Sequence, residues 1–229
     1  MNNKVELLGY YGSDEIIACS AWTSTSRDLT DDKRSRVGKL INMLWREGHE
    51  TPFEKGIVHF LVDCEIASHI HLLKHRISSL NAESARYKEL KEDKYYLPED
   101  WAEVRNSDPN LRVDANGEKH QKWGTILRRY TELGNSLYHQ CMNDIEPTLG
   151  RKRAKESARF FKTYNSQIQA DIMFNMRSFA NFIELRDSEH AQVEIRDIAQ
   201  AMWNLVENIE GQPFKHTLET IRVRIQSNS

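Results

Sequence analysis

Hydrophobic residues recur at spacings of three and four along much of the chain, which is the period of an amphipathic helix. The clearest case runs from Asp31 to Trp45, where acidic residues near the amino end favour a helix start and Gly48 follows as a stop. The same pattern predicts further helices at 66–73, 123–147, 151–161, 178–185, 190–209 and 214–223, with Ser188 as a cap before 190–209. The predicted apolar stripes of the two longest are Trp123, Leu127, Tyr130, Leu137 and Cys141, and Ile195, Ile198, Met202, Leu205, Val206 and Ile209. After the helix at 66–73 we expect a loop or extended chain.

Two segments alternate instead between apolar and polar residues, which is typical of strands with one buried face. The apolar positions are Val58, Phe60 and Val62 within 57–66, and Ile168, Ala170, Ile172 and Phe174 within 164–176. Long helices with two or three scattered strands, not arranged as regular strand-helix-strand units, predict an α+β fold.

The chain has 229 residues and 39% hydrophobic content, which is enough for a substantial core. No linker appears, so we expect a single domain over residues 1–229. A polar excursion at about 95–122 contains two prolines and the turn-forming pair Asn116-Gly117, and it predicts a surface segment with a short hairpin.

Charge and cysteine content narrow the classes of function. A net charge of −2 provides no global positive field for nonspecific binding of nucleic acid or for docking on an anionic membrane. Three cysteines without a paired spacing argue against a disulfide framework and a thiolate zinc site. No stretch resembles a signal peptide or a membrane span, so we expect a cytoplasmic protein.

The most informative window runs from Lys74 to Arg86 and is nearly free of apolar residues. It reads Lys-His-Arg-Ile-Ser-Ser-Leu-Asn-Ala-Glu-Ser-Ala-Arg. Cations, hydroxyls and amides are costly to bury without partners, so this window does not build a core. It predicts a binding site for a polar, anionic ligand, and a phosphorylated one fits best.

This window resembles the signature of the flavin-dependent thymidylate synthases: Arg-His-Arg, two free positions, Ser, one free, Asn, two free, Ser, one free, Arg. Six of these places are matched, by His75, Arg76, Ser79, Asn81, Ser84 and Arg86. Lys74 takes the first place and keeps the charge without the planar donor pair of arginine. Ala82 stands where the family often has glutamate, with Glu83 one residue later, so that hydrogen bond must be absent or remade.

A second segment, His-Glu-Thr-Pro-Phe-Glu at 49–54, resembles the family's His-Glu-Thr-Pro-Phe-Glu-His, with Lys55 in the last place. Standing alone it could be a simple turn fixed by proline. Beside the first signature, Thr51 and His49 become candidate flavin contacts.

A third segment, 175–186, resembles Asn-x-Arg-Ser-x-x-Asn-Phe-x-x-Leu-Arg. On a helix, Arg177 and Asn181 lie four residues apart and share one face. The alternative without a binding role is a helix whose polar residues face water. The cations at 151–159 are also mostly a solvated face, but Glu156-Ser-Ala-Arg159 resembles the helix with which the family reaches the nucleotide phosphate.

Three histidines, His69, His71 and His75, raise the question of a metal. A catalytic zinc needs three protein ligands, and the cations beside His75 would repel a dication. We therefore expect no metal, and interpret these side chains as pocket lining or surface. His71 stands where the family often has glutamine and is a candidate contact for the nucleotide.

The resemblance implies roles residue by residue. The implied contacts of dUMP are His71, Lys74, Glu83, Ser84, Arg86, Arg159 and Arg186. The implied contacts of FAD are His49, Thr51, Lys74, His75, Arg76, Asn175, Arg177 and Asn181. Arg186 is the implied catalytic residue, which faces the uracil ring and stabilises charge that develops there.

The implied reaction is the reductive methylation of dUMP to dTMP, with FAD as cofactor, NADPH as reductant and methylenetetrahydrofolate as one-carbon donor. The implied fold packs helices around a small, mostly antiparallel sheet. The implied assembly is a homotetramer whose active sites are shared between subunits, without nucleic acid or membrane as partner. The alternative is a noncatalytic helical module that binds nucleic acid or a phosphoprotein through the cations at 74–86 and 151–159.

Overall fold

A computed structural model describes residues 2–84, 86–90, 92–108, 110–111 and 122–228, without the side chains of 227 and 228. The predicted turn at Asn116-Gly117 lies outside these residues. The chain folds as two compact units. Unit 1 comprises Met1–Asn3, Asp63–Ile70 and Ala82–Ala170, and unit 2 comprises Lys4–Val62, His71–Asn81 and Asp171–Ser229.

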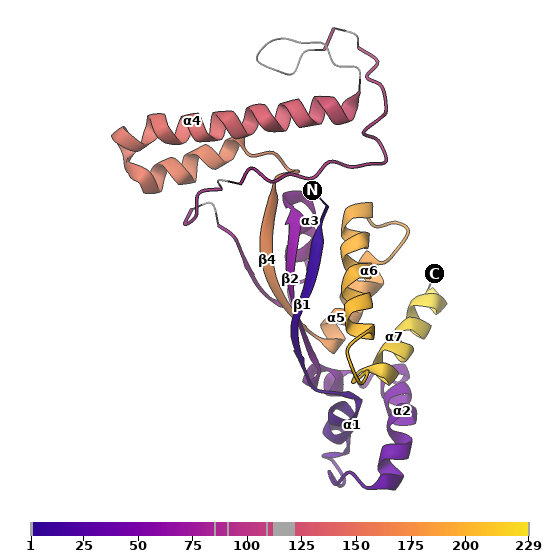
Figure 1. Cartoon of the computed structure of the whole chain (residues 1–229). Helices are drawn as coiled ribbons and strands as arrows, with labels where there is room; N and C mark the ends of the chain where they lie inside the picture. The colour runs from indigo at the N-terminus through magenta and orange to yellow at the C-terminus, as the bar shows by residue number, and fades with distance from the viewer. Residues whose placement is uncertain (1, 85, 91, 109, 112–121, 229) are drawn as a thin grey trace. The chain divides into compact units, whose positions relative to one another are not determined.

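The structure confirms an α+β class with seven α-helices and four strands among the described residues (Figure 1). In chain order the elements are β1 (Lys4–Tyr11), α1 (Asp14–Trp22), α2 (Asp31–Arg46), η1 (Thr51–Lys55), β2 (Ile57–Glu65), α3 (Ile66–Leu73), β3 (Ser79–Ala82), α4 (Trp123–Ala158), η2 (Arg159–Phe161), β4 (Gln167–Asn175), α5 (Met176–Arg186), α6 (Val193–Glu207) and α7 (Lys215–Asn228). Of these, β1, α1, η1 and β3 have no counterpart among the helices and strands predicted from the sequence.

The strands form one sheet in the order β1-β2-β4-β3, and the sheet is antiparallel. On β2 and β4, His59 pairs with Asp171 at 2.7 Å, and the Gln169 side chain donates to Asp63 at 3.3 Å. Along these pairs the residue number rises on β2 and falls on β4, so the two strands run antiparallel. The predicted alternation is confirmed at six positions, since Val58, Phe60, Val62, Ala170, Ile172 and Phe174 are all fully buried, whereas Ile168 is only half-buried.

Helices α5 and α6 cover one face of the sheet in unit 2 (Figure 1). The ring of Phe179 on α5 stacks on Phe60 of β2 at 5.9 Å, and on Trp203 of α6 at 6.5 Å between centroids. The predicted stripe of the long helix faces this core, with Ile195, Ile198, Met202, Val206 and Ile209 buried. The predicted cap was wrong: α6 begins at Val193 after Gln192, and the Ser188 hydroxyl accepts instead from the His190 backbone.

Helix α2 begins and ends as its sequence indicates. The Thr30 hydroxyl accepts from the Lys33 backbone N–H and caps the first turn. At the other end Gly48 has a φ of 73°, and the next backbone N–H, that of His49, donates to the Leu44 carbonyl at 2.8 Å. This left-handed glycine closure ends the helix and aims the following residues at the loop before η1.

Helix α4 differs from its prediction. It continues past Pro147, and the chain turns only at Gly150, whose φ of 80° is favourable for glycine alone. Its buried side chains in unit 1 include Ile126, Tyr138 and Met142, whereas Trp123, Tyr130 and Leu137 of the predicted apolar stripe are at least 37% exposed. None of the helices that the structure describes, α4 included, has the length and apolar character needed to cross a membrane.

Candidate active site

A pocket of about 510 Å³ lies in unit 2, within the size range of small-molecule sites. It gathers six of the residues predicted from the sequence: Lys74, His75, Arg76, Arg177, Asn181 and Arg186. The remaining lining residues are Trp45, Glu50, Glu54, Ile77, Ser178, Glu184, Leu185 and Arg224. Five cations and three carboxylates give this pocket a formal charge of +2, which suits an anionic ligand.

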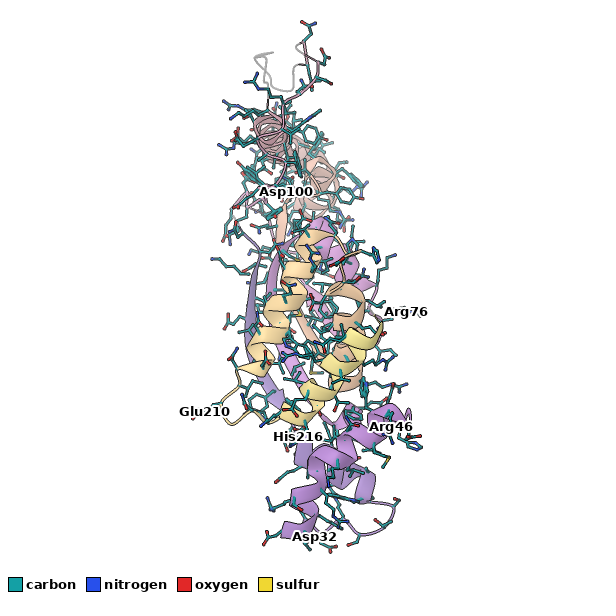
Figure 2. The ribbon with its side chains drawn as sticks, turned by 90° about the vertical axis from the view of Figure 1, so that its right-hand side faces the viewer. Asp32, Arg46, Arg76, Asp100, Glu210 and His216 are labelled. Atoms are coloured by element: carbon teal, nitrogen blue, oxygen red, sulfur yellow. The ribbon has the colours of Figure 1, made fainter. Side chains whose placement is uncertain are left out.

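The loop after α3 and the first turns of α5 bring these side chains to the pocket. Helix α3 ends at Leu73, so residues 74–78 leave its carboxyl end as a loop before β3, as the sequence predicted. The Arg76 side chain of this loop projects outward (Figure 2). Helix α5 is capped by Asn175, whose side-chain oxygen accepts from the Ser178 backbone at 2.8 Å, and its next turns present Arg177 and Asn181 to the pocket.

The closest contact between two predicted site residues joins His75 and Arg186. Arg186 donates from Nε to His75 Nε2 at 3.0 Å, and the His75 ring packs edge-on against Phe182 at 4.9 Å. Burial, the Arg186 cation and nearby His71 lower the pKa of His75 to about 4. The ring is therefore neutral at pH 7 and can accept this hydrogen bond, which holds the Arg186 side chain by its Nε and leaves its terminal nitrogens for a ligand.

The lowered pKa of His75 makes a prediction about stability. The unfolded chain binds a proton near pH 6.5 and the folded chain only near pH 4, so stability is lost as the pH falls through this window. Between pH 7 and pH 4 the free energy of unfolding should fall by about 3 kcal/mol more in the wild type than in His75→Gln. Urea unfolding followed by tryptophan fluorescence at both pH values measures the difference. Parallel losses in the two proteins would contradict the buried neutral ring.

Carboxylates hold the Arg177 guanidinium at the pocket wall. Its Nε donates to Glu50 at 2.9 Å and its Nη1 donates to Glu54 at 2.8 Å. The Arg177 side chain is half exposed, whereas the Glu50 carboxylate is 22% exposed. A guanidinium in this setting can exchange an exposed carboxylate partner for a phosphate without being buried unpaired.

The other predicted flavin contacts in unit 2 lie outside the pocket lining. His49 and Thr51 are exposed, at the end of the loop after α2 and at the start of η1. Asn175 is committed to the cap of α5, also accepting from the Ser178 hydroxyl at 2.9 Å. His71, predicted to contact the nucleotide, is half-buried in the last turn of α3.

The remaining predicted nucleotide contacts belong to unit 1. Arg86 pairs with Glu156 at 3.4 Å, one helical turn before Arg159, which is exposed. The structure thus brings Arg86 to the part of α4 predicted to reach phosphate. Ser84 accepts weakly from the Arg86 backbone at 3.4 Å.

Glu83, which lies one residue after the place where the family often has glutamate, forms hydrogen bonds within the fold. Glu83 accepts from the Gln169 backbone N–H at 3.1 Å and from Lys88 at 2.7 Å. Glu83 therefore forms hydrogen bonds within unit 1, to β4 and to Lys88. Its side chain is half-buried, and because a carboxylate accepts more than two hydrogen bonds it can also accept from a ligand.

Sequence reasoning missed eight pocket residues: Trp45, Glu50, Glu54, Ile77, Ser178, Glu184, Leu185 and Arg224. A signal existed for Glu50 and Glu54, which flank Thr51 and lie four residues apart in the matched segment at 49–54. Arg224 carried no such signal, because its helix lies far along the chain from every motif.

Comparison with known proteins relates this geometry to a family. The family model for thymidylate synthase complementing protein, Thy1, matches residues 6–210. The chain belongs to the Thy1 family. The match runs from β1 to just beyond α6, and therefore covers the loop at 74–78, α5 and α4, but not α7.

This Thy1 chain aligns with several relatives over most of its own length and most of theirs. A flavin-dependent thymidylate synthase of Pseudothermotoga lettingae is 33% identical over 205 residues, which are 90% of this chain and 85% of that protein. One of Clostridium tetani is 28% identical over 95% of this chain and 87% of that one. The solved structure of the UMP/dUMP methylase PolB from Streptomyces cacaoi, bound with 5-Br dUMP, superposes with a TM-score of 0.74 and 26% identity, over 97% of this chain and 95% of PolB.

Proposed function

We propose that this Thy1 chain, as one domain over residues 1–229, is a flavin-dependent thymidylate synthase. It would methylate dUMP to dTMP with FAD, methylenetetrahydrofolate and NADPH as reductant. The observation that carries the proposal is the pocket of unit 2, which joins six residues of two separate signature segments around a net positive charge. The names of the relatives and the dUMP analogue in PolB support the same substrate class.

The residues present fit an FAD molecule by the chemistry of their donors. Arg76, Arg177 and Lys74 supply cations for its phosphates, and Asn181 supplies an amide. When bound, reduced FAD would supply a hydride to the pyrimidine, and the folate would supply the one-carbon unit. The chain's own contribution is to bind and orient, and His49, Thr51, His75 and Asn175 belong to the proposed FAD set.

The proposed nucleotide contacts divide by chemistry. For the phosphate of dUMP we propose Arg86 and Arg159, because arginine forms bidentate hydrogen bonds to phosphate oxygens. Ser84, Glu83, His71 and Lys74 belong to the proposed dUMP set, and Arg186 is proposed to face the uracil ring. Arg186 donates to uracil oxygens as negative charge develops on the ring, and the neutral His75 keeps its guanidinium aimed.

We further propose that the protein works as a homotetramer with shared active sites. Trp123, Tyr130 and Leu137 repeat every seven residues along α4 and remain 39%, 56% and 37% exposed in the single chain. Residues seven apart lie on one helical face, and an apolar face exposed in this way favours contact with another copy. Sedimentation of the purified protein measures the assembly.

An absorbance spectrum tests the proposed cofactor. Protein reconstituted with excess FAD and then desalted should keep a flavin spectrum and oxidise NADPH. Lys74→Ala combined with Arg177→Ala should lose the bound colour, while Arg151→Ala, a control on α4 paired with Glu89 and Glu146, should keep it. A colourless protein that binds nucleic acid in a salt-dependent way would contradict the proposal and favour the noncatalytic alternative.

The cysteines support a mechanism without a thiolate nucleophile. Cys64 is fully buried, and burial together with the carboxylates of Glu65 and Asp63 raises its pKa to about 12. A thiol with that pKa carries almost no thiolate at pH 7 and cannot attack the pyrimidine.

We therefore predict that replacing Cys19, Cys64 and Cys141 together by alanine leaves dTMP formation within about tenfold of the wild type. The residual effect is that of a packing disturbance, because only Cys64 is fully buried. Turnover is compared with the melting temperature and the FAD content of the same preparation. Turnover abolished in a folded, FAD-loaded protein would require a nucleophilic cysteine.

A further inference from the structure

The carboxyl-terminal helix α7 adds a wall to the pocket from outside the part of the chain that matches the family model. It spans Lys215–Asn228, whereas the match ends at residue 210. Its first turn is fixed by the buried carboxylate of Asp14, which accepts from the backbone N–H groups of His216 at 2.6 Å and Thr217 at 3.1 Å, and from the Thr217 hydroxyl at 2.7 Å. Such a cap defines where the helix starts and hence where its later turns lie.

Two turns further on, Arg224 lines the pocket between two carboxylates. Its Nη1 donates to Glu50 at 3.2 Å, its Nη2 lies 3.4 Å from Glu184, and its guanidinium lies over the ring of Trp45 at 5.4 Å. All four residues line the same pocket. The Arg224 side chain is 40% exposed, so it faces the pocket while its partners hold it.

Glu50 is the link between Arg224 and the predicted flavin contact Arg177. One carboxylate oxygen, Oε2, accepts from Arg177, and the other, Oε1, accepts from Arg224. The negative charge of Glu50 is thus shared between two guanidinium groups. The two guanidinium groups around this carboxylate repel each other, and this repulsion offsets part of the attraction that holds each of them to Glu50.

We propose that Arg224 is a positioning residue of the pocket, whose cation repels Arg177, offsets part of the attraction of Glu50 for Arg177 and so lets Arg177 exchange a carboxylate for the phosphates of an anionic cofactor. The proposal rests on the function proposed above, in that it takes the occupant of this pocket to be FAD. Loss of the Arg224 cation would leave Glu50 to Arg177 alone and would lower the formal charge of the pocket from +2 to +1. Both changes oppose the binding of an anion.

The chain contains a closely matched control on the same helix. Arg222 also pairs with a carboxylate, that of Glu207 at 2.7 Å, and its guanidinium also lies over an indole ring, that of Trp203 at 5.3 Å. It does not line this pocket. Replacing either arginine by alanine therefore removes the same kinds of contact from α7, and only one replacement changes the pocket.

The experiment measures dissociation constants of FAD, riboflavin and inorganic pyrophosphate by titration calorimetry. Arg224→Ala should weaken FAD and pyrophosphate about fivefold to tenfold, which is the scale of one partly exposed charge, and should leave riboflavin unchanged because it has no phosphate. Arg222→Ala should leave all three within about twofold. Arg224→Lys should recover part of the loss, since it restores the charge but not both hydrogen bonds.

A double-mutant cycle separates positioning from packing. In a Glu50→Gln chain, Arg177 no longer faces a shared charge, so adding Arg224→Ala should cost less than in the wild type. Equal costs in both backgrounds, equal effects of Arg222→Ala, or an equal loss of riboflavin would overturn the proposal. If Arg224→Ala melts early, Glu50→Gln alone carries the test, and unchanged or weaker pyrophosphate binding would then overturn it.

The two proposals fail in different ways. Wild-type protein that binds pyrophosphate but not FAD would contradict the proposed function, and the arginine variants would still be compared through pyrophosphate. Wild-type protein that binds FAD, with the same affinity in Arg224→Ala, would contradict only the role of Arg224.

Discussion

Arg186→Lys should lower kcat for dTMP formation by about 10²- to 10³-fold, while the dissociation constant of dUMP changes by less than about fivefold. Lysine keeps a positive charge but lacks the Nε–H that donates to His75 at 3.0 Å. The cation is then no longer held where charge develops in the reaction, although it can still attract the ligand. Single-turnover kinetics and equilibrium titration with dUMP measure the two quantities.

The control for this variant is Arg222→Lys, an arginine of the same unit whose partner is Glu207, away from the proposed site. It should leave kcat within about twofold. An Arg186→Lys enzyme with an unchanged kcat and a raised Michaelis constant would mean that Arg186 only binds substrate, and the assignment of Arg186 as the catalytic residue would be wrong.

Arg86→Ala should weaken dUMP binding by about 2–4 kcal/mol, roughly 30- to 1000-fold, and affect FAD less. Its guanidinium is half exposed and pairs with Glu156 at 3.4 Å, a long and weak contact that a phosphate can replace. Removing it would take away a proposed bidentate partner of the nucleotide phosphate. Calorimetric titration with each ligand separates the two affinities.

Arg151 offers a comparison within unit 1, because it is similarly exposed and pairs with Glu89 and Glu146 at 3.2 and 3.0 Å. Arg151→Ala should change dUMP binding by less than about threefold. If Arg86→Ala lost both ligands equally, the division of roles between the cations of unit 1 and those of unit 2 would not stand.

Most of the fold could be predicted because apolar residues recur at a regular helical or strand spacing in its longer elements. Helix α2, strands β2 and β4, and helix α6 each bury one regular stripe, so pattern and structure agree. The sequence did not reveal β1, where Leu8 and Tyr10 are exposed and blur the alternation, or α1, where Ile16, Ile17 and Ala18 give no one-sided stripe. The hydrophobic periodicity of a sequence identifies a helix or strand only when one face of that element is apolar and the other is polar.

Helix α4 illustrates the opposite error. Its apolar stripe was clear, but Trp123, Tyr130 and Leu137 are exposed in the single chain. A sequence pattern records every surface that is buried in the working protein, including those that a second copy would cover. It cannot say which of these surfaces the isolated chain buries.

For the site, the sequence predicted the cations and amides of short motifs but not the residues that hold them. Lys74, Arg177 and Arg186 lie in contiguous segments, so their spacing is readable. Arg224 reaches the pocket only through the packing of α7, and no motif lies near it in the sequence to signal that approach. Pocket residues that come from elements far apart in the sequence can be identified only once the three-dimensional structure is known.

The measurement that tests the central claim most directly is the balance of products from dUMP. With O₂ excluded, FAD-loaded protein supplied with dUMP, methylenetetrahydrofolate and NADPH should form dTMP, tetrahydrofolate and NADP⁺ in equal amounts, because in the proposed reaction the hydride comes from NADPH through the flavin and not from the folate. Liquid chromatography with mass detection quantifies all three. Formation of dihydrofolate in step with dTMP, or dTMP formation that does not require FAD, would contradict the account.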